Sequence, residues 1–194
     1  DVIGDIPSGG KTLEFVPYAA CHRLPDDREL EARCAAAMQA FNAPWSMIML
    51  ELDDVGMFDT EAERRGKVFV TTELGGGGST TPQTVAVAKR GLRNVLQHAG
   101  ILPGKVDMRP SRQLDMPDER CFVTSEHSGM LEFMVELGDG VAEGDLIARV
   151  YDLERSGWRP VEYTAYRDGV VAGRHYPGLV QSGDTLAVIA VPQT

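Results

Sequence analysis

Apolar positions recur at two different spacings in the first hundred residues, one typical of helices and one typical of strands. Apolar residues at helical spacing follow Asp26 and Asp27, whose side chains offer N-cap oxygens, and they predict a helix that ends near Phe41. Short apolar runs predict strands at residues 13–17, 46–52 and 67–72. Strands that alternate with helices indicate an α/β layer whose sheet is at least partly parallel.

A second long helix is predicted to start at Thr80 or Thr81, with Pro82 in its first turn and Gly100 as its stop. A short charged helix is predicted before it, at residues 60–65. One face of the long helix is apolar. It consists of Val85, Ala88, Leu92, Val95, Leu96 and Ala99.

The pattern changes after residue 102. Residues 102–120 hold three prolines and little periodicity, which predicts a linker or an irregular crossing. From Cys121 onward the chain has short alternating strands and Gly-Asp turns, and two similar units can be aligned, at residues 128–147 and 168–186. This predicts an internally duplicated β barrel or sandwich. We therefore divide the chain into residues 1–102, the later part of an α/β domain, a linker at 103–120 and a β domain at 121–194.

The first residues also bear on the domain organisation. The chain begins at Asp1 without a methionine, and residues 1–6 (DVIGDI) are typical of a strand already under way. We therefore expect the α/β domain to be N-terminally incomplete.

Composition and charge narrow the range of functions. A hydrophobic share of 43% and a charged share of 25% are ordinary for a globular protein, and no apolar run approaches the roughly 18 residues of a membrane span. Nucleic acid is an unsuitable partner, because 29 acidic residues outweigh 19 Lys and Arg and the net charge is -10. Three cysteines without a CxxC motif fit a reducing cytoplasm better than a disulfide framework.

The strongest candidate for chemistry is Glu73, at the end of the apolar run at 67–72 and just before the glycines at 75–78. Glycines let a backbone approach a ligand closely, and burial would raise the pKa of this carboxyl toward the range of a general acid or base. A carboxylate here also fits a cap for the loop or the following helix. Spacing alone leaves both interpretations open.

A second glycine-rich turn follows the first strand, in the sequence DIPSGG at residues 5–10. The order of this turn, a helix, a strand, TELGGGG and a C-terminal β region resembles the succinylglutamate desuccinylase/aspartoacylase family of zinc-dependent amide hydrolases. The stretches CHRLPDDRELEARCAAAMQAFNAP and DDVGMFDTEAERRGKVFVTTELGGGG are most similar to the members that deacetylate N-acetyl-diaminobutyrate in ectoine degradation. The resemblance extends over nearly the whole chain.

This resemblance implies a zinc-carboxypeptidase-like mixed sheet, a zinc cofactor and hydrolysis of a small N-acyl amino acid. Glu73 matches the family's catalytic carboxylate, which takes a proton from water and delivers it to the leaving amine. Ser8, Gly9 and Gly10 match the turn of the DxHSGG motif and are candidate substrate-binding residues. Where that motif has a zinc-binding His this chain has Pro7, which has no donor atom, and the family's HxxE motif is absent. We therefore expect no metal ligands in this chain and expect the chain by itself to be inactive.

Further residues are weaker candidates for substrate binding. Asp53, with its neighbours Asp54 and Asp59, could bind a cationic amine of the substrate, although these residues also fit a solvated loop. His175 and Tyr176 could close over the pocket from the β region, as C-terminal residues do in the resembled family. The other histidines are expected to be structural or on the surface, with His22 in a polar loop.

The alternatives to an enzyme are a carrier domain and a non-catalytic module. The duplicated Gly-Asp turns resemble a biotinyl or lipoyl carrier, but no lysine follows Lys105, so a carrier role is excluded. Pro7 and the missing motif favour a non-catalytic paralogue or fragment that acts as a binding or assembly module, whereas the intact TELGGGG segment favours an enzyme. The β region is further expected to pair subunits in a homo-oligomer through its sheet edges.

Overall fold

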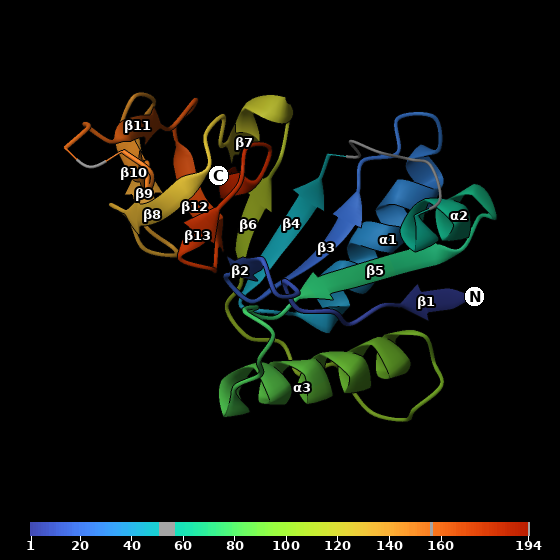
Figure 1. Ribbon diagram of the computed structural model, residues 1–194. Helices are drawn as coiled ribbons and strands as arrows, with labels where there is room; N and C mark the ends of the chain where they lie inside the picture. Colours follow the sequence, from blue (N-terminus) through green and yellow to red (C-terminus); the bar gives the residue numbers. More distant parts are fainter. Residues whose placement is uncertain (51–56, 156, 194) are drawn as a thin grey trace.

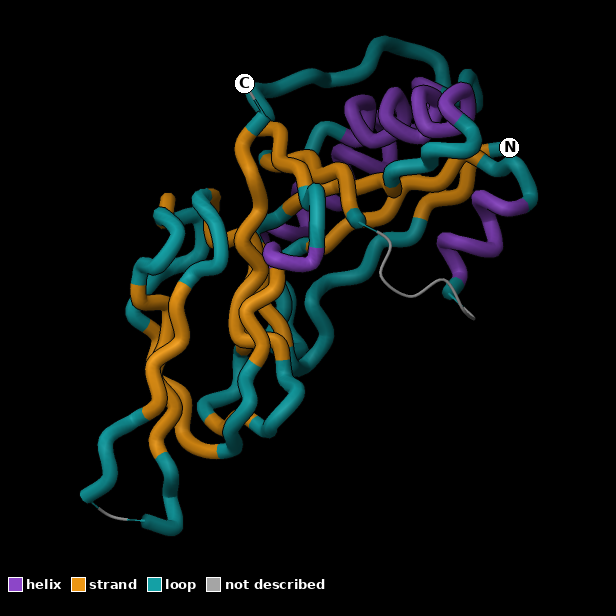
Figure 2. Tube along the Cα trace, turned by 90° about the horizontal axis from the view of Figure 1, so that it is seen from above, coloured by secondary structure: helices purple, strands orange, loops and turns teal. Residues whose placement is uncertain are grey.

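The computed structural model describes residues 1–50, 57–155 and 157–193. Strands of both halves of the chain join in one mixed sheet, and a smaller second sheet lies at the C-terminal end (Figure 1). Seen from above, the helices gather at the end of the molecule that holds the N-terminus, while the C-terminal strands extend away from them (Figure 2). This agrees with the expected mixed α/β fold.

The larger sheet begins with the strands of the N-terminal half. The order β1, β5, β3, β4, β6 combines parallel and antiparallel pairs: β1 is parallel to β5, β3 is antiparallel to β5, and β4 lies parallel to both β3 and β6. A partly parallel sheet was predicted and is confirmed. The bounds are β1 Val2–Gly4, β3 Tyr18–His22, β4 Trp45–Met49, β5 Val68–Glu73 and β6 Arg112–Asp115.

Local capping signals set both long helices. The Asp27 side chain accepts a hydrogen bond from the Leu30 N–H at 3.0 Å and starts α1, Arg28–Phe41. Thr81 and Thr84 form a reciprocal capping box at the start of α3, Pro82–His98. Both helices begin where the sequence predicts, and the short helix α2, Phe58–Arg64, begins two residues earlier than expected.

The buried face of α3 differs from the predicted apolar face. Val85 and Leu92 belong to the apolar face but are 38% and 47% exposed. The helix instead turns Gly91 and Asn94 inward. The Phe41 ring of α1 lies so close to Gly91 that a Cβ there would overlap it, and Asn94 exchanges two hydrogen bonds with the Asp107 backbone. A tertiary contact therefore decides which face of α3 is buried, and hydrophobic periodicity does not reveal such a contact.

Residues predicted as linker contain a strand. β6 joins β4 on one side and the last strand on the other, so the sheet runs through residues 112–115 into the C-terminal half. The early strand β2, Leu13–Phe15, also crosses the predicted division, because it pairs with β12, Gly169–His175, rather than with its neighbours in sequence. The division into 1–102, 103–120 and 121–194 stays a prediction.

The C-terminal half repeats one order of strands. In each of two units a longer strand precedes a two-residue strand and a second longer strand, and the short strand of each unit pairs with the first strand of the other. The barrel form stays a prediction, as does the likeness to zinc carboxypeptidases. The strands are β7 Phe122–Thr124, β8 Gly129–Phe133, β9 Gly140–Val141, β10 Leu146–Tyr151, β11 Val161–Thr164, β12 Gly169–His175, β13 Leu179–Val180 and β14 Thr185–Pro192, with a 3₁₀ turn at Glu119–Cys121.

The turn after β12 contacts both glycine-rich turns of the N-terminal half. The Tyr176 N–H donates to the Thr12 carbonyl at 2.8 Å, and the Tyr176 ring lies over Gly77, where a Cβ would be 2.5 Å from ring atoms. Gly77 has a φ of 65°, which also favours glycine. The C-terminal strands therefore help to hold the glycine-rich turns. Among the described residues, no helix is long and apolar enough to cross a membrane.

Candidate functional site

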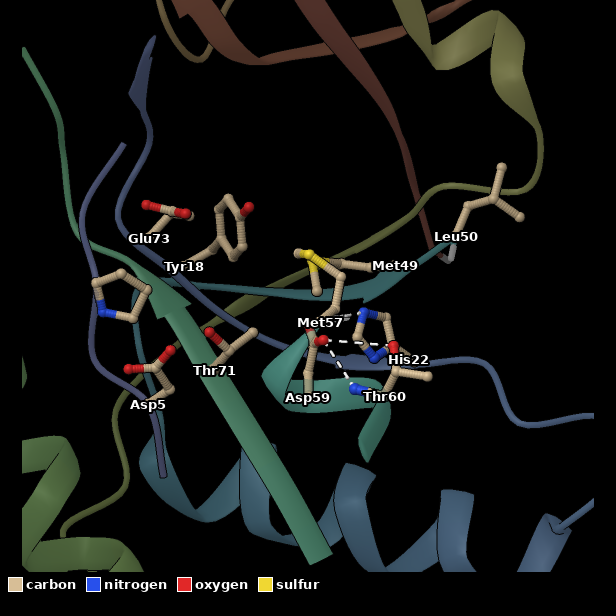
Figure 3. A pocket seen from close by; sticks show the side chains of 11 residues that line it. Asp5, Tyr18, His22, Met49, Leu50, Met57, Asp59, Thr60, Thr71 and Glu73 are labelled. Atoms are coloured by element: carbon tan, nitrogen blue, oxygen red, sulfur yellow. Dashed lines mark hydrogen bonds and ion pairs between the residues drawn. The ribbon is translucent and has the colours of Figure 1, made fainter. Parts of the chain in front are cut away.

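A pocket of about 410 Å³ opens where β3, β4 and β5 meet the segment after β1. Its wall combines carboxylates, apolar side chains and one histidine, and Figure 3 shows these side chains from close by. The lining residues are Asp5, Pro7, Tyr18, His22, Met49, Leu50, Met57, Asp59, Thr60, Thr71 and Glu73.

Glu73 is the last residue of β5 and reaches the pocket just before the glycine run. Its pKa is raised from 4.5 to about 7, first because burial disfavours the charged form and second because the negative charge of Asp5 is near. A hydrogen bond from the Gly9 backbone opposes part of this rise in pKa. Within the described residues, the buried Oε2 oxygen of Glu73 has no hydrogen-bond partner. The carboxyl can thus both take and give a proton near neutral pH.

The two glycine-rich turns pack against each other beside Glu73. A Cβ on Gly9 would overlap the carbonyl of Gly75 in the other turn, and a Cβ on Gly76 would overlap the carbonyl of Leu13, so the close approach of the two turns requires glycine. The Gly78 N–H donates to the Gly10 carbonyl, and the Leu74 N–H donates to the Pro7 carbonyl at 3.3 Å. These backbone bonds fix the position of the residue that follows Glu73.

Tyr18 lies opposite Glu73 in the register of β3 and β5, and only 5% of it is exposed. Burial and the neighbouring Glu73 charge both raise the pKa of this phenol far above its usual value. Tyr18 therefore keeps its proton at neutral pH and is available as a hydrogen-bond donor in the pocket. Tyr18 is a pocket residue that the sequence alone does not predict.

The other end of the pocket is built by α2 and the end of β3. Asp59 and Glu63 are four residues apart on α2, which brings both side chains to one face of the helix. His22 lies between them, with Nδ1 3.1 Å from Glu63 Oε2 and Nε2 3.7 Å from Asp59 Oδ2. The Thr60 N–H donates to Asp59 Oδ1 at 2.8 Å. His22 ends β3 and is 5% exposed, so its predicted place in a polar loop is wrong.

The predicted site residues separate in the structure. Glu73 and Pro7 line the pocket, whereas Ser8, Gly9 and Gly10 form the turn behind it. His175 is buried with Nε2 3.1 Å from the Leu179 carbonyl and is not part of the lining. Asp53 lies outside the described residues. The roles assigned to these residues stay predictions.

His22 is a second pocket residue that was not predicted from the sequence, and Asp59 was predicted only as a neighbour of Asp53. One signal could have found His22, because it closes an apolar run and ligands gather at strand ends in α/β sheets. The position of α2 against that strand end has no local signature. Only the structure therefore shows that Asp59 lines the pocket with His22.

The lining residues do not fit a zinc site. Pro7 offers no donor atom, and His22 is engaged with Asp59 and Glu63. Over residues 1–50, 57–155 and 157–193 no group of three or more His, Cys, Asp or Glu side chains could hold a metal ion. The donor set present in this part of the chain is incomplete.

Comparisons with known proteins identify similar chains. Residues 1–99 match the family described as the succinylglutamate desuccinylase/aspartoacylase catalytic domain. The N-alpha-acetyl-L-2,4-diaminobutyric acid deacetylase of Halomonas elongata is 52% identical over 192 residues, which are 98% of this chain and 56% of the deacetylase.

Solved structures of family members have a similar fold. The product-bound ectoine utilization protein EutE (DoeB) from Ruegeria pomeroyi has a TM-score of 0.95 and 56% identity, covering 98% of this chain and 58% of that one. A succinylglutamate desuccinylase from Silicibacter sp. has a TM-score of 0.92 and 56% identity, covering 100% and 58%. The chain spans less than two thirds of the length of each of these three relatives.

Proposed function

Because the chain belongs to the succinylglutamate desuccinylase/aspartoacylase family, we propose that its pocket serves the hydrolysis of a small N-acyl amino acid such as N-acetyl-diaminobutyrate. The observation that carries this proposal is the raised pKa of Glu73, about 7, in a pocket at the ends of β3 and β5. The names of two close relatives, a diaminobutyric acid deacetylase and an ectoine utilization protein, support the choice of substrate.

Glu73 carries the proton in the proposed reaction. As ionised carboxylate it takes a proton from a water molecule whose oxygen attacks the acyl carbon. It then gives this proton to the amide nitrogen as the carbon–nitrogen bond breaks, which leaves a carboxylic acid and a free amine. A pKa near the working pH makes both transfers efficient in one residue.

Tyr18 assists the same step as a hydrogen-bond donor. Its phenol keeps its proton because burial and the Glu73 charge oppose ionisation. A donor beside the reacting carbonyl stabilises the negative charge that develops on the acyl oxygen. Tyr18 and Glu73 are register partners on adjacent strands, so the sheet itself holds donor and carboxylate together.

The expected zinc is not assigned to the described residues, because their donor set is incomplete. Zinc would supply a Lewis acid for the acyl oxygen. The single His that the family motif leads us to expect is Pro7 here, so we propose that the wild-type protein is slow and that a histidine at this position raises its activity.

The experiment is an assay of N-acetyl-diaminobutyrate hydrolysis by the protein expressed from its complete gene, as wild type and as Pro7→His. The proposal expects release of diaminobutyrate and acetate, faster in the variant. Absence of hydrolysis by both proteins, at correct folding by circular dichroism, would overturn it. That outcome would favour the second candidate, a non-catalytic binding module, for which Pro7 is the supporting observation.

A further inference from the structure

We infer that the end of the pocket opposite Glu73 binds the free ammonium group of a diamino acid substrate, with Asp59 as the contacting residue and His22 and Glu63 as positioning residues. This inference rests on the proposed function and specifies its substrate class. Figure 3 shows Glu73 and Asp5 on one side of the pocket and Asp59 and His22 on the other.

The charge of the pocket lining favours an ammonium group as ligand. Asp5, Asp59 and Glu73 line the pocket, and no lysine or arginine does so among the described residues. Within residues 1–50, 57–155 and 157–193, the charged or titratable groups around Asp59 are His22 and Glu63, with Tyr18 farther along the wall. A carboxylate end of a substrate would be repelled here, whereas an ammonium group would gain a charge-assisted hydrogen bond.

Neighbouring groups hold the Asp59 carboxylate in place. Its two oxygens have separate partners, since Oδ1 accepts from the Thr60 N–H and Oδ2 lies 3.7 Å from His22 Nε2. The supporting side chains are almost fully buried, with 7% of His22 and 4% of Glu63 exposed, while 19% of Asp59 remains exposed. A pre-positioned, partly exposed carboxylate on buried supports costs little to order when a ligand binds.

The pocket wall between Glu73 and Asp59 also fits a diamino acid. Met49 and Met57 line it together with the ring of Tyr18, so the middle of the pocket is largely apolar. An acyl amide at Glu73 and an ammonium group at Asp59 would then be joined by methylene groups along this wall. N-acetyl-diaminobutyrate has this order of groups.

The test compares two substrates that differ in the second amine, N-acetyl-diaminobutyrate and N-acetyl-2-aminobutyrate. Wild type should prefer the diamine about 10- to 100-fold in kcat/KM, the range of one hydrogen bond to a charged group. Asp59→Asn should remove this preference mainly through KM, and Asp59→Glu should restore part of it. Asp26→Asn removes an exposed aspartate outside this pocket and should keep the preference.

His22→Gln tests the positioning role. It should reduce the preference for the diamine, with most of the loss in the KM for N-acetyl-diaminobutyrate. A merely structural role would lower kcat/KM for both substrates by the same factor and leave the preference unchanged.

The outcomes separate the inference from the proposed function. Equal rates on both substrates, or an unchanged preference in Asp59→Asn, would overturn the inference and leave the deacylase intact. If neither wild type nor Pro7→His hydrolyses either substrate, the proposed function fails, and calorimetric binding of diaminobutyrate against 2-aminobutyrate decides the inference alone. Binding of the diamine that is no tighter in wild type than in Asp59→Asn would then overturn it.

Discussion

Asp5 and Glu73 reach the same pocket from different segments, and the charge of Asp5 adds to burial in raising the pKa of Glu73 to about 7. Hydrogen bonds hold the two segments together, because the Asp5 N–H donates to the Val70 carbonyl at 3.0 Å and the Thr72 hydroxyl to the Pro7 carbonyl at 3.2 Å. The pairing is therefore a property of the fold and gives Asp5 a role in setting the proton affinity of Glu73.

Asp5→Asn should lower the pKa of Glu73, because it removes the second-largest cause of the rise. Burial remains, so the pKa should stay above 4.5. Carbon-detected NMR titration of the glutamate carboxyl groups measures the change directly. Asp26→Asn is the matched control and should leave the titration of Glu73 as it is, while an unchanged pKa in Asp5→Asn would refute the role of Asp5.

The raised pKa of Glu73 also predicts a pH-dependent stability. The folded state holds this proton more tightly than the unfolded state, so the free energy of unfolding should fall as pH rises from about 4.5 to about 7. Glu73→Gln removes this loss and should gain about 2 kcal/mol relative to wild type between pH 5 and 8, a figure reduced to allow for partial exposure. Urea unfolding at both pH values measures it, with Glu143→Gln as an exposed control. A difference that does not change with pH would contradict the account.

Gly76→Ala should destabilise the protein by about 1–3 kcal/mol, the usual range for overpacking. The added Cβ would overlap the Leu13 carbonyl, which is backbone and cannot rotate away. The control is Gly140→Ala, where a Cβ meets no atom within 4 Å. Thermal unfolding should separate the two variants clearly, and similar melting temperatures would mean that the two glycine-rich turns are not in close contact.

Pro7→His tests whether a histidine at position 7 acts as a ligand to a metal ion. The new imidazole would add a donor beside Asp5 and Glu73, so zinc bound per protein should rise relative to wild type. Elemental analysis after dialysis measures it, and Pro7→Ala, which adds no donor, should match wild type. Equal zinc in the histidine and alanine variants would show that position 7 does not contribute a ligand.

The parts of the fold that follow local rules could be predicted from the sequence. The Asp27 and Thr81 caps, the strand that ends at Glu73 and the repeated C-terminal units all carry their signals within a few residues. The orientation of α3 could not be predicted, because it depends on the Phe41 ring packing over Gly91.

The candidate site divides in the same way. Glu73 could be found because a single acidic residue closes an apolar run before four glycines. Asp59 and His22 meet only because α2 packs beside the end of β3, a contact between segments far apart in sequence. Tyr18 depends on the register of β3 and β5, which alternation alone does not fix.

The central claim, that Glu73 transfers the proton in amide hydrolysis, is tested most directly by Glu73→Gln in the Pro7→His protein. The account predicts that kcat for N-acetyl-diaminobutyrate falls about 100-fold or more, with KM nearly unchanged, since a general acid or base contributes at least this much. Glu143→Gln in the same background should keep full activity. A loss of only a few-fold in the Glu73→Gln protein would contradict the account.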